Sequence, residues 1–544
     1  MLRLTEIKLP LDHEPEALRD AVLARLRVAP EDVLDITVFR RGHDARRRGA
    51  IALIYTLDVT LRDEAAVLAR VAGERHVAPT PETAYRLPAA PPAPRLRPVV
   101  IGAGPCGLFA MLILAQLGLR PILIERGQIV RQRTQDTWGL WRRSVLSPES
   151  NVQFGEGGAG TFSDGKLYSG IGDNANRIRK VLEEFVAAGA PEEILYLSKP
   201  HIGTFRLVSM VEKMRAGIEA LGGEYRFGTR VEDVELGPDR AVRGLHLSDG
   251  TFLEADRVVL AIGHSARDTF AALHERGVFM EAKPFSIGVR IEHPQGLIDR
   301  CRFGPQAGHP TLGAADYKIV HHCKTPAAEG RAVYSFCMCP GGQVVAAASE
   351  PGRLVTNGMS QYSRAERNAN AGIVVSITPE RDYPGSPLAG LAFQRHWEER
   401  AFIAGGSNWN APVQRVEDFL AARPSTRLGE VIPSYKPGVT PTDLSLCLPD
   451  FAVAAIREAL PAFDRQIRGF AMGDAVMTAV ETRTSSPLRI RRDETGQSLN
   501  TPGLFPAGEG AGYAGGILSA GVDGIRAAEA VAASLSAGAL VASS

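Results

Sequence analysis

Three glycines with a fixed spacing indicate the first chemistry. Gly102, Gly104 and Gly107 form a G-x-G-x-x-G motif directly after the apolar residues 99–101, and a long apolar stretch follows them. In a strand–turn–helix unit the first glycine permits a tight turn, the second lets the backbone approach a pyrophosphate, and the third lets the helix pack on the strand. The N-terminus of such a helix offers free N–H groups and partial positive charge to phosphates. The spacing therefore predicts a dinucleotide-binding turn.

An acidic residue ends the next apolar run. Glu125 lies 23 residues after Gly102, where a carboxylate can accept hydrogen bonds from both hydroxyls of a ribose. A 2′-phosphate would be repelled by that carboxylate, which disfavours NADP at this site. The motif and the acid together do not distinguish FAD from NAD.

A second concentration of glycine lies at 150–170, in the sequence SNVQFGEGGAGTFSDGKLYSG. So much glycine does not favour the interior of a helix or a strand. We expect this backbone to run against a flat ligand, with Thr161, Ser163 and Lys166 reaching a phosphate or the polar edge of a ring system. The alternative is a flexible surface loop.

The C-terminal segment TPGLFPAGEGAGYAGGILSAGVDGIRAAEAVAASL reads as a strand, a glycine-rich turn and a long helix. It resembles the segment with which two-dinucleotide-fold flavoproteins hold the ribityl chain and the flavin ring. The resemblance implies that Glu509, where many relatives carry Asp, contacts the flavin arm, and that the helix N-terminus stabilises the anionic reduced ring. The string VVLAIG resembles another strand of that superfamily, which implies Gly263 near FAD and Val231 near the adenine.

Six strings together resemble the bacterial FAD-dependent dehydrogenases that carry an N-terminal extension: IGAGPCGLFA, NVQFGEGGAGTFSDGKL, FCMCPGGQVV, VTNGMS, ETRTSSPLRI and FPAGEGAGYAGGILSAGVDGI. The layout is more distantly similar to the fumarate-reductase-like and aminoacetone-oxidase-like flavoproteins. That similarity implies a second domain inserted into the FAD domain and covering the flavin. Substrates are not known for the group.

These observations predict an α/β protein with three parts. A doubly wound, Rossmann-like FAD-binding domain is expected at 99–274 and 466–544, and an inserted, mostly antiparallel β-rich substrate domain at 275–465. Residues 1–87 follow a β-α-β-β-α pattern typical of a small ferredoxin-like α+β domain. The Pro-rich residues 88–98 form a linker.

The motif and the resemblance together predict contacts to FAD from several separated segments. The predicted contacts are Gly102, Ala103, Gly104, Pro105, Cys106, Gly107, Glu125, Arg126, Gly157, Gly158, Ala159, Gly160, Thr161, Lys166, Val231, Gly263, His264, Gly508, Glu509, Gly510, Gly512, Gly516 and Ile517.

No catalytic acid or base is assigned from the sequence. The candidates for catalysis are Arg483, Glu481, His264 and Cys337. Arg483 could bind an anionic substrate or stabilise the charge of the reduced flavin, whereas an ordinary salt bridge or a hydrogen-bonded histidine is the plainer interpretation for each candidate. On a regular strand, Cys337 and Cys339 lie on one face, ~7 Å apart, which is long for a disulfide. Strand packing is therefore the expected role of these two thiols.

The remaining features bear on cofactors and partners. No second G-x-G-x-x-G occurs within 275–465, so NADH or NADPH would dock transiently as an electron donor, or another donor would act. None of the six cysteines has a zinc-ligand spacing, and no metal is predicted. The N-terminus has no apolar core typical of a signal peptide, and no apolar stretch is long enough for a membrane span, so a cytoplasmic protein is expected.

The leading functional hypothesis is an FAD-dependent oxidoreductase, a dehydrogenase or reductase, that transfers hydride at flavin N5 to or from a small-molecule substrate. An FAD-dependent monooxygenase is the first alternative. The second is a flavoprotein with structural FAD whose N-terminal module binds a partner, such as RNA, through Arg46, Arg47 and Arg48. The chain has 62 Lys and Arg against 61 Asp and Glu, so its net charge does not indicate a nucleic acid partner. The sequence does not define the oligomeric state.

Overall fold

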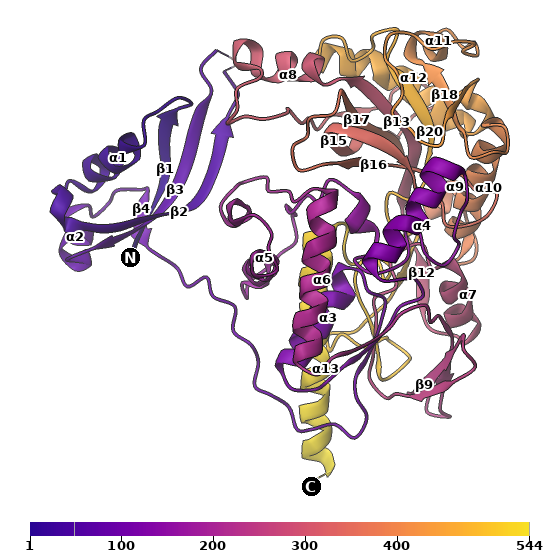
Figure 1. Cartoon of the computed structure of the whole chain (residues 1–544), viewed down its shortest axis with the longest axis horizontal. Coiled ribbons are helices and arrows are strands. Elements are labelled where there is room, and N and C mark those ends of the chain that lie inside the picture. Colours follow the sequence, from indigo (N-terminus) through magenta and orange to yellow (C-terminus); the bar gives the residue numbers. More distant parts are fainter. Residues whose placement is uncertain (48, 543–544) are drawn as a thin grey trace.

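The computed structural model describes residues 1–47 and 49–542, so Arg48 of the basic run lies outside the described residues. Figure 1 shows a small N-terminal module, drawn in indigo, beside a larger body formed by the rest of the chain. A parallel sheet and an antiparallel sheet make up most of that body. Within the described residues, no helix is both long enough and apolar enough to cross a membrane.

The N-terminal module is a four-stranded antiparallel sheet in the order β2-β3-β1-β4, with its own apolar core. The strands alternate buried and exposed side chains, as expected for a sheet covered on one face by helices. The elements follow the predicted order and add a short fourth strand: β1 (Leu2–Pro10), α1 (Glu16–Leu26), β2 (Val33–Asp44), β3 (Ala52–Leu61), α2 (Glu64–Arg70) and β4 (Val77–Pro79).

The module touches the main body through apolar and polar contacts, and the buried Ile51 joins the apolar core of the antiparallel sheet. The backbone of Arg41 on β2 exchanges hydrogen bonds with Tyr196 and Ser198, at 2.7 and 2.9 Å. The residues that follow β4 run in an extended form along the body, where Tyr85 donates to Glu529 at 2.9 Å. The chain then enters the parallel sheet.

The parallel sheet has five strands in the order β22-β11-β5-β6-β7. Its members are β5 (Val99–Ile101), β6 (Ile122–Ile124), β7 (Glu224–Arg226), β11 (Val258–Leu260) and β22 (Leu504–Pro506). β5 pairs on one side with β6 and on the other with β11, so the direction of strand addition reverses beside β5. Ligands of such sheets bind outside the carboxyl ends of the strands at this reversal.

The two faces of the parallel sheet are covered differently. A helical layer packs on one face: α3 (Pro105–Gln116), α5 (Arg177–Ala187), α6 (Thr204–Ala220) and α13 (Ile517–Ala542). The other face carries a three-stranded antiparallel sheet and one helix: β8 (Val231–Leu236), β9 (Val242–Leu247), β10 (Phe252–Glu254) and α7 (Arg267–Glu275). The doubly wound arrangement predicted from the sequence therefore needs correction, because a β-meander replaces most of the second helical layer.

The second large unit is an eight-stranded sheet ordered β14-β15-β17-β13-β20-β18-β19, with β16 paired to β15. Its strands are β13 (Phe285–Pro294), β14 (Val320–His322), β15 (Ala332–Ala346), β16 (Thr356–Ser360), β17 (Asn368–Ile377), β18 (Ala411–Arg415), β19 (Val439–Pro441) and β20 (Val476–Glu481). Except for the parallel pair β18–β19, the strands are antiparallel. β20 extends this sheet past residue 465, the limit expected from the sequence.

Helices cover the antiparallel sheet and join it to the first unit. They are α8 (Gln295–Phe303), α9 (Pro379–Asp382), α10 (Ala389–Ala404), α11 (Val416–Leu420) and α12 (Asp450–Gln466), together with α4 (Val130–Arg143) from the first unit. The crossing points between the two units are β12 (Met280–Ala282) and β21 (Leu488–Ile490), which pair with each other. The two passages of the chain between the units are thus held side by side.

Candidate functional site

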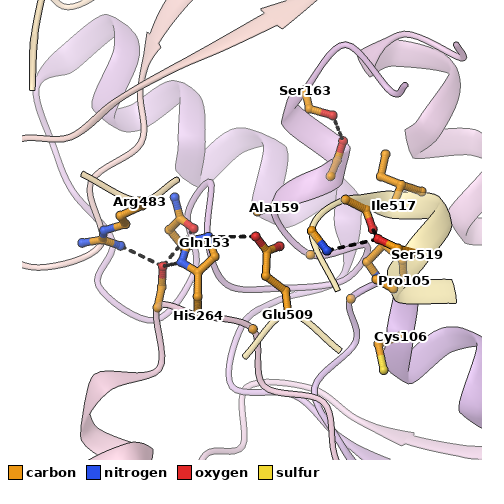
Figure 2. A pocket seen from close by; sticks show the side chains of 18 of the residues that line it. Pro105, Cys106, Gln153, Ala159, Ser163, His264, Arg483, Glu509, Ile517 and Ser519 are labelled. Carbon is orange, nitrogen blue, oxygen red and sulfur yellow. Dashed lines mark hydrogen bonds and ion pairs between the residues drawn. The ribbon is translucent and has the colours of Figure 1, made fainter. Parts of the chain in front are cut away.

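One cavity of about 620 Å³ lies between the parallel sheet and the antiparallel sheet. Its floor is formed by the turn after β5, the end of β11 and the segment before α13, and its far wall by β15. Figure 2 shows Glu509 in this cavity between His264 on one side and Pro105, Ile517 and Ser519 on the other. Segments separated by about 400 residues in the sequence therefore share one site.

The G-x-G-x-x-G turn has the geometry that its spacing predicts. Gly102 has φ +103°, and a Cβ there would lie 2.4 Å from the carbonyl oxygen of Ala261 on the neighbouring strand. A Cβ on Gly107 would lie 1.8 Å from the carbonyl oxygen of Gly102. At Gly104, by contrast, the nearest atom to an added Cβ is 3.7 Å away. The first and third glycines are required for packing, whereas the second leaves space beside the N-terminus of α3.

Glu125 directly follows β6 and lines the cavity, and its carboxylate also accepts hydrogen bonds from backbone N–H groups. Its two oxygens accept hydrogen bonds from the N–H groups of Ala103, Gly127 and Gly155, at 2.8, 2.8 and 2.9 Å. Each carboxylate oxygen has two acceptor sites, so one of the four remains free, on the oxygen that accepts from Ala103, whereas the sequence predicted acceptance from both ribose hydroxyls. Glu125 thus ties the first glycine turn to the second glycine-rich segment.

The glycine-rich segment is mostly buried from 150 to 167 and forms a wall of the cavity, and the interpretation as a flexible surface loop is wrong for these residues. The fully buried Arg133 of α4 holds this segment with hydrogen bonds to the carbonyl oxygens of Asn151, Val152, Glu156 and Gly158, at 2.7–2.9 Å. Burial lowers the pKa of Arg133 to about 10, so the guanidinium stays charged near neutral pH. The backbone is thereby fixed against the cavity.

The turn before α13 meets the end of β11. A Cβ on Gly510 would lie 2.3 Å from the carbonyl oxygen of Gly263, so the two turns touch through their backbones. Gly516, with φ +144°, precedes the first turn of α13 and has no atom within 4 Å of an added Cβ. The N-terminus of α13 therefore opens onto the same cavity as the N-terminus of α3.

Most of the predicted cofactor contacts line this cavity. Those that line it are Gly102, Ala103, Gly104, Pro105, Cys106, Glu125, Arg126, Gly158, Ala159, Gly160, Lys166, Val231, Gly263, His264, Glu509, Gly516 and Ile517. Those that do not are Gly107, Gly157, Thr161, Gly508, Gly510 and Gly512. At several of these glycines an added Cβ would strike a neighbouring segment, so they serve close packing behind the wall. Among the catalytic candidates, Arg483, His264 and Cys337 line the cavity and Glu481 does not.

The titratable groups on the cavity floor are strongly perturbed. Burial raises the pKa of the Glu509 carboxyl to about 7, against the opposing charge of Lys283. The 28% of the Glu509 side chain that is exposed faces the cavity. Burial, with help from Arg483 and Arg267, lowers the pKa of His264 to about 3, so this imidazole is neutral near pH 7. Its Nε2 lies 4.0 Å from Glu509.

Arg483 belongs to a buried charge cluster and is not a free cation. It donates to both oxygens of Glu398 at 3.2 Å and to the hydroxyls of Ser265 and Ser349, at 3.0 and 2.7 Å. Arg267 contacts the same carboxylate at 2.7 Å. Burial alone would raise the pKa of Glu398, but the two guanidinium groups hold it well below its usual range. The structure therefore confirms the plainer interpretation of Arg483, which is a salt bridge.

Glu481 forms a second buried ion pair, with Arg290 of β13 at 2.9 Å through both of its oxygens. Arg290 also donates to the carbonyl oxygen of Cys337, at 2.9 Å. This cavity-lining cysteine has φ +41°, a conformation that non-glycine residues rarely adopt. The pair thus supports the cavity wall at Cys337 from behind.

Family comparisons agree with the flavin-related motifs. Residues 149–276 match the family described as flavin containing amine oxidoreductase, and residues 284–484 match the family described as FAD-dependent protein, C-terminal domain-like. Residues 1–60 match a domain of unknown function. An uncharacterised protein of Clostridium beijerinckii is 45% identical over 528 residues, which cover 97% of this chain and 98% of the relative. The chain belongs to the FAD-dependent oxidoreductase family.

Two solved structures that are similar to this FAD-dependent oxidoreductase are distant from it in sequence. A 3-ketosteroid-delta4-(5alpha)-dehydrogenase from Rhodococcus jostii RHA1 is 12% identical with a TM-score of 0.35, over 80% of this chain and 96% of that chain. A flavocytochrome c3 fumarate reductase in its open conformation is 12% identical with a TM-score of 0.31, over 81% and 78% of the two chains. Such low TM-scores support no further comparison.

The cavity of this oxidoreductase fits FAD by its size and its lining. Ligand sites span about 300–1,000 Å³, and the cavity volume of about 620 Å³ lies within that range. Two helix N-termini face it, and glycines at 104, 263, 515 and 516 leave open space where a Cβ would project. When bound, FAD would supply two-electron chemistry at its ring. The residues available to hold it come from the four glycine-containing turns.

Sequence reasoning missed two groups of residues. The first is Arg133, which no sequence motif marks. Its role depends on four carbonyl groups that are brought to it only when the glycine-rich segment folds. The second group is the far wall of the cavity, which includes Lys318, Tyr334, Phe336 and Met338. Alternating strands were predicted there, but the register that turns these side chains toward the cavity was not.

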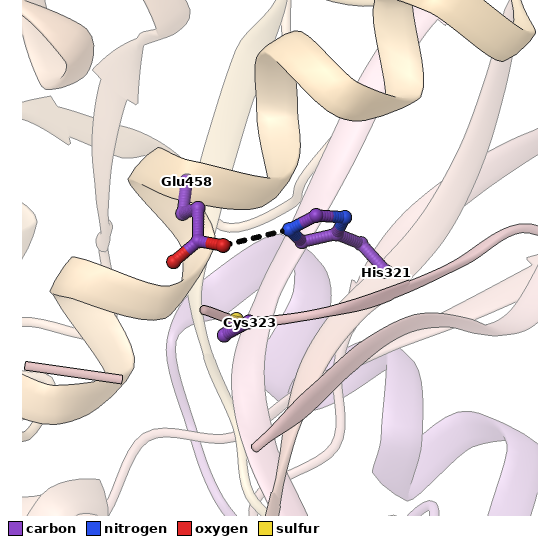
Figure 3. A group of neighbouring side chains, drawn as sticks. All are labelled: His321, Cys323 and Glu458. Atoms are coloured by element: carbon purple, nitrogen blue, oxygen red, sulfur yellow. Dashed lines mark hydrogen bonds and ion pairs between the residues drawn. The ribbon is translucent and has the colours of Figure 1, made fainter. Parts of the chain in front are cut away.

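A cluster away from the cavity contains three side chains of metal-ligating type, His321, Cys323 and Glu458, whose ligand atoms lie within 4.8 Å of one another (Figure 3). The Glu458 carboxylate accepts hydrogen bonds from His321 at 2.9 Å and from the turn at Lys324 and Thr325. Burial raises the pKa of the Cys323 thiol to about 11, which disfavours the thiolate that a metal needs. The carboxylate caps the turn after β14.

Proposed function

We propose that this FAD-dependent oxidoreductase is a dehydrogenase or reductase that binds FAD along the cavity and transfers hydride between flavin N5 and a small organic molecule. The single observation that supports it is the continuity of the cavity. It runs from the turn at Gly104 and Glu125, past Glu509 and the α13 N-terminus, to the antiparallel sheet at Phe336.

In this proposal the two ends of the cavity bind different parts of FAD. The pyrophosphate would lie against the N-terminus of α3 at Gly104, and a ribose hydroxyl would donate to the one free acceptor site of Glu125. The flavin ring lies toward Gly263 and Gly516, where the missing side chains leave space. The positive end of the α13 dipole stabilises negative charge on the reduced ring.

The substrate side is formed by β15 and its neighbours. Tyr334, Phe336 and Tyr168 give it an aromatic character, and the charges of Lys166 and Lys318 are balanced by Asp164 and Asp316 in the same lining. Such a lining favours a flat or apolar substrate. We propose that residues 275–484 form this substrate-covering domain and that residues 1–87 form a separate ferredoxin-like module.

The absorbance spectrum of the purified protein tests the proposal. Oxidised FAD gives a yellow protein, and anaerobic addition of NADH or NADPH should bleach it if either nucleotide serves as the donor. Reoxidation by oxygen through a long-lived peroxyflavin would favour the monooxygenase alternative. A colourless protein that does not take up added FAD would contradict the proposal.

A further inference from the structure

The strand that forms the far wall of the cavity is interrupted at its Cys-Met-Cys sequence. Phe336 of β15 pairs with Gly372 and Cys339 pairs with Asn370, so three residue steps on β15 face two on β17. This is a β-bulge, and the left-handed backbone of Cys337, at φ +41°, turns the chain at that point. The spacing of ~7 Å expected between i and i+2 side chains of a regular strand does not hold there.

The bulge brings the Cys339 side chain against Cys337. The Cys339 thiol donates a hydrogen bond to the carbonyl oxygen of Cys337 at 3.3 Å. The interaction between the two residues lowers the pKa of Cys337 and raises that of Cys339. Cys337 lines the cavity, whereas Cys339 is fully buried behind it. A ligand in the cavity can therefore reach Cys337 but not Cys339.

Two cations from different elements fix the bulge. Lys166, from the glycine-rich segment, donates to the carbonyl oxygen of Met338, and Arg290, from β13, donates to that of Cys337 at 2.9 Å. Both positive charges also act to lower the pKa of the Cys337 thiol, which favours its thiolate form. A strained backbone held by the buried Arg290 and the half-buried Lys166 beside a pair of thiols exceeds what strand packing requires.

We propose that Cys337 and Cys339 form a redox-active dithiol that exchanges two electrons with FAD bound in this cavity. The inference rests on the proposed function, because it needs FAD in the cavity. In the oxidising direction the two S–H bonds break and one S–S bond forms. The two electrons pass to oxidised FAD, which takes up the two protons as it becomes the reduced form. In the reverse direction, reduced FAD cleaves the disulfide.

The arrangement also indicates a substrate class, low-molecular-weight disulfides. The Cys337 thiolate can attack such a disulfide from the cavity, which forms a mixed disulfide and releases one thiol. Cys339 then attacks Cys337 and releases the second thiol, and the internal disulfide that remains takes two electrons and two protons from reduced FAD, which returns to its oxidised form. The accessible thiol is the attacking group and the buried thiol is the resolving group.

Anaerobic titration of the yellow, air-oxidised holoprotein with dithionite tests the proposal. The wild type should take up four electrons per FAD, two in the flavin and two in the disulfide, whereas Cys339→Ser should take up two. The matched control is Cys301→Ser, since Cys301 is half-buried and lies outside the cavity. This control should take up as many electrons as the wild type.

Alkylation of the wild type with iodoacetamide gives a readout that needs no variant. In denatured oxidised protein, the peptide that contains 337 and 339 should resist alkylation, and it should gain two adducts after reduction. A yellow protein that takes up two electrons per FAD, with both thiols alkylated before reduction, overturns the dithiol but not the proposed function. A protein that binds no FAD overturns the proposed function and this inference with it.

Discussion

The guanidinium of Arg133 lies 2.9 Å from the carbonyl oxygen of Gly158, and this contact joins helix α4 to the most glycine-rich wall of the cavity. Glycine gives this wall its close approach to a ligand but contributes no side chain to hold its shape. The fully buried arginine supplies the missing rigidity, because its planar group donates to four carbonyl oxygens at once.

Replacement of Arg133 should therefore release the glycine-rich wall of the cavity from helix α4. An Arg133→Lys variant keeps the charge but cannot reach four carbonyl groups, so we expect a loss of about 3 kcal/mol or more in the free energy of unfolding. FAD content should fall at least tenfold. Urea unfolding and the ratio of flavin to protein absorbance measure the two effects. Arg131→Lys on the same helix, at an exposed site, is the control and should change neither.

Gly104 offers a test that separates binding from folding. A Cβ added to Gly104 would lie 3.7 Å from its nearest neighbouring atom, and the φ of Gly104 is −73°, which any residue can adopt. Gly104→Val should therefore leave the unfolding midpoint of the cofactor-free protein nearly unchanged, while the branched side chain blocks the pyrophosphate and gives colourless protein. Gly107→Ala, which places a Cβ 1.8 Å from the carbonyl of Gly102, should instead unfold at clearly lower urea. A yellow Gly104→Val protein with full flavin content would refute the assignment of the turn.

Glu509 should make the cofactor-free protein less stable as the pH rises. Its pKa is raised from 4.5 to about 7 in the folded state, so the folded protein holds a proton that the unfolded chain has lost. Stability from this group is fully present below pH 4.5 and declines until the pH passes 7. The total is about 3–4 kcal/mol at most, since one pKa unit is worth about 1.4 kcal/mol.

The Glu509→Gln variant isolates that contribution. Urea unfolding of wild type and variant should differ little at pH 4.5, and the variant should be the more stable above pH 7. Parallel curves of unfolding free energy against pH would show that Glu509 ionises normally in the folded protein.

The buried cluster around Glu398 should be sensitive to loss of its carboxylate. Glu398→Gln leaves Arg267 and Arg483 buried without their shared counter-charge, for which we expect a loss of about 3–5 kcal/mol in the free energy of unfolding. Glu399→Gln, at an exposed position one residue away, should shift the urea midpoint little. Equal midpoints for the two variants would mean that the arginines find other partners or water.

Some of this molecule follows directly from local sequence. The turn at Gly102, the helix α3 after it and the acid at Glu125 are encoded by a short pattern, because the positive φ of Gly102 and the close contact of Gly107 with it lie within one strand–turn–helix unit. The elements of residues 1–79 were predictable for the same reason, since alternating and helical periodicities are local. The C-terminal turn at Gly516 could be placed by its resemblance to flavoproteins.

Other features were decided only by the tertiary structure. The position of Arg133, the charge cluster at Glu398 and the extent of the antiparallel sheet to Glu481 depend on groups brought together from distant segments. The bulge at Cys337 depends on its pairing with β17 and on two cations from other elements, so a regular strand was the reasonable expectation from sequence. Local patterns set the conformation of single turns, helices and strands. Burial and long-range pairing set the protonation of buried groups and the strand register that shape the cavity.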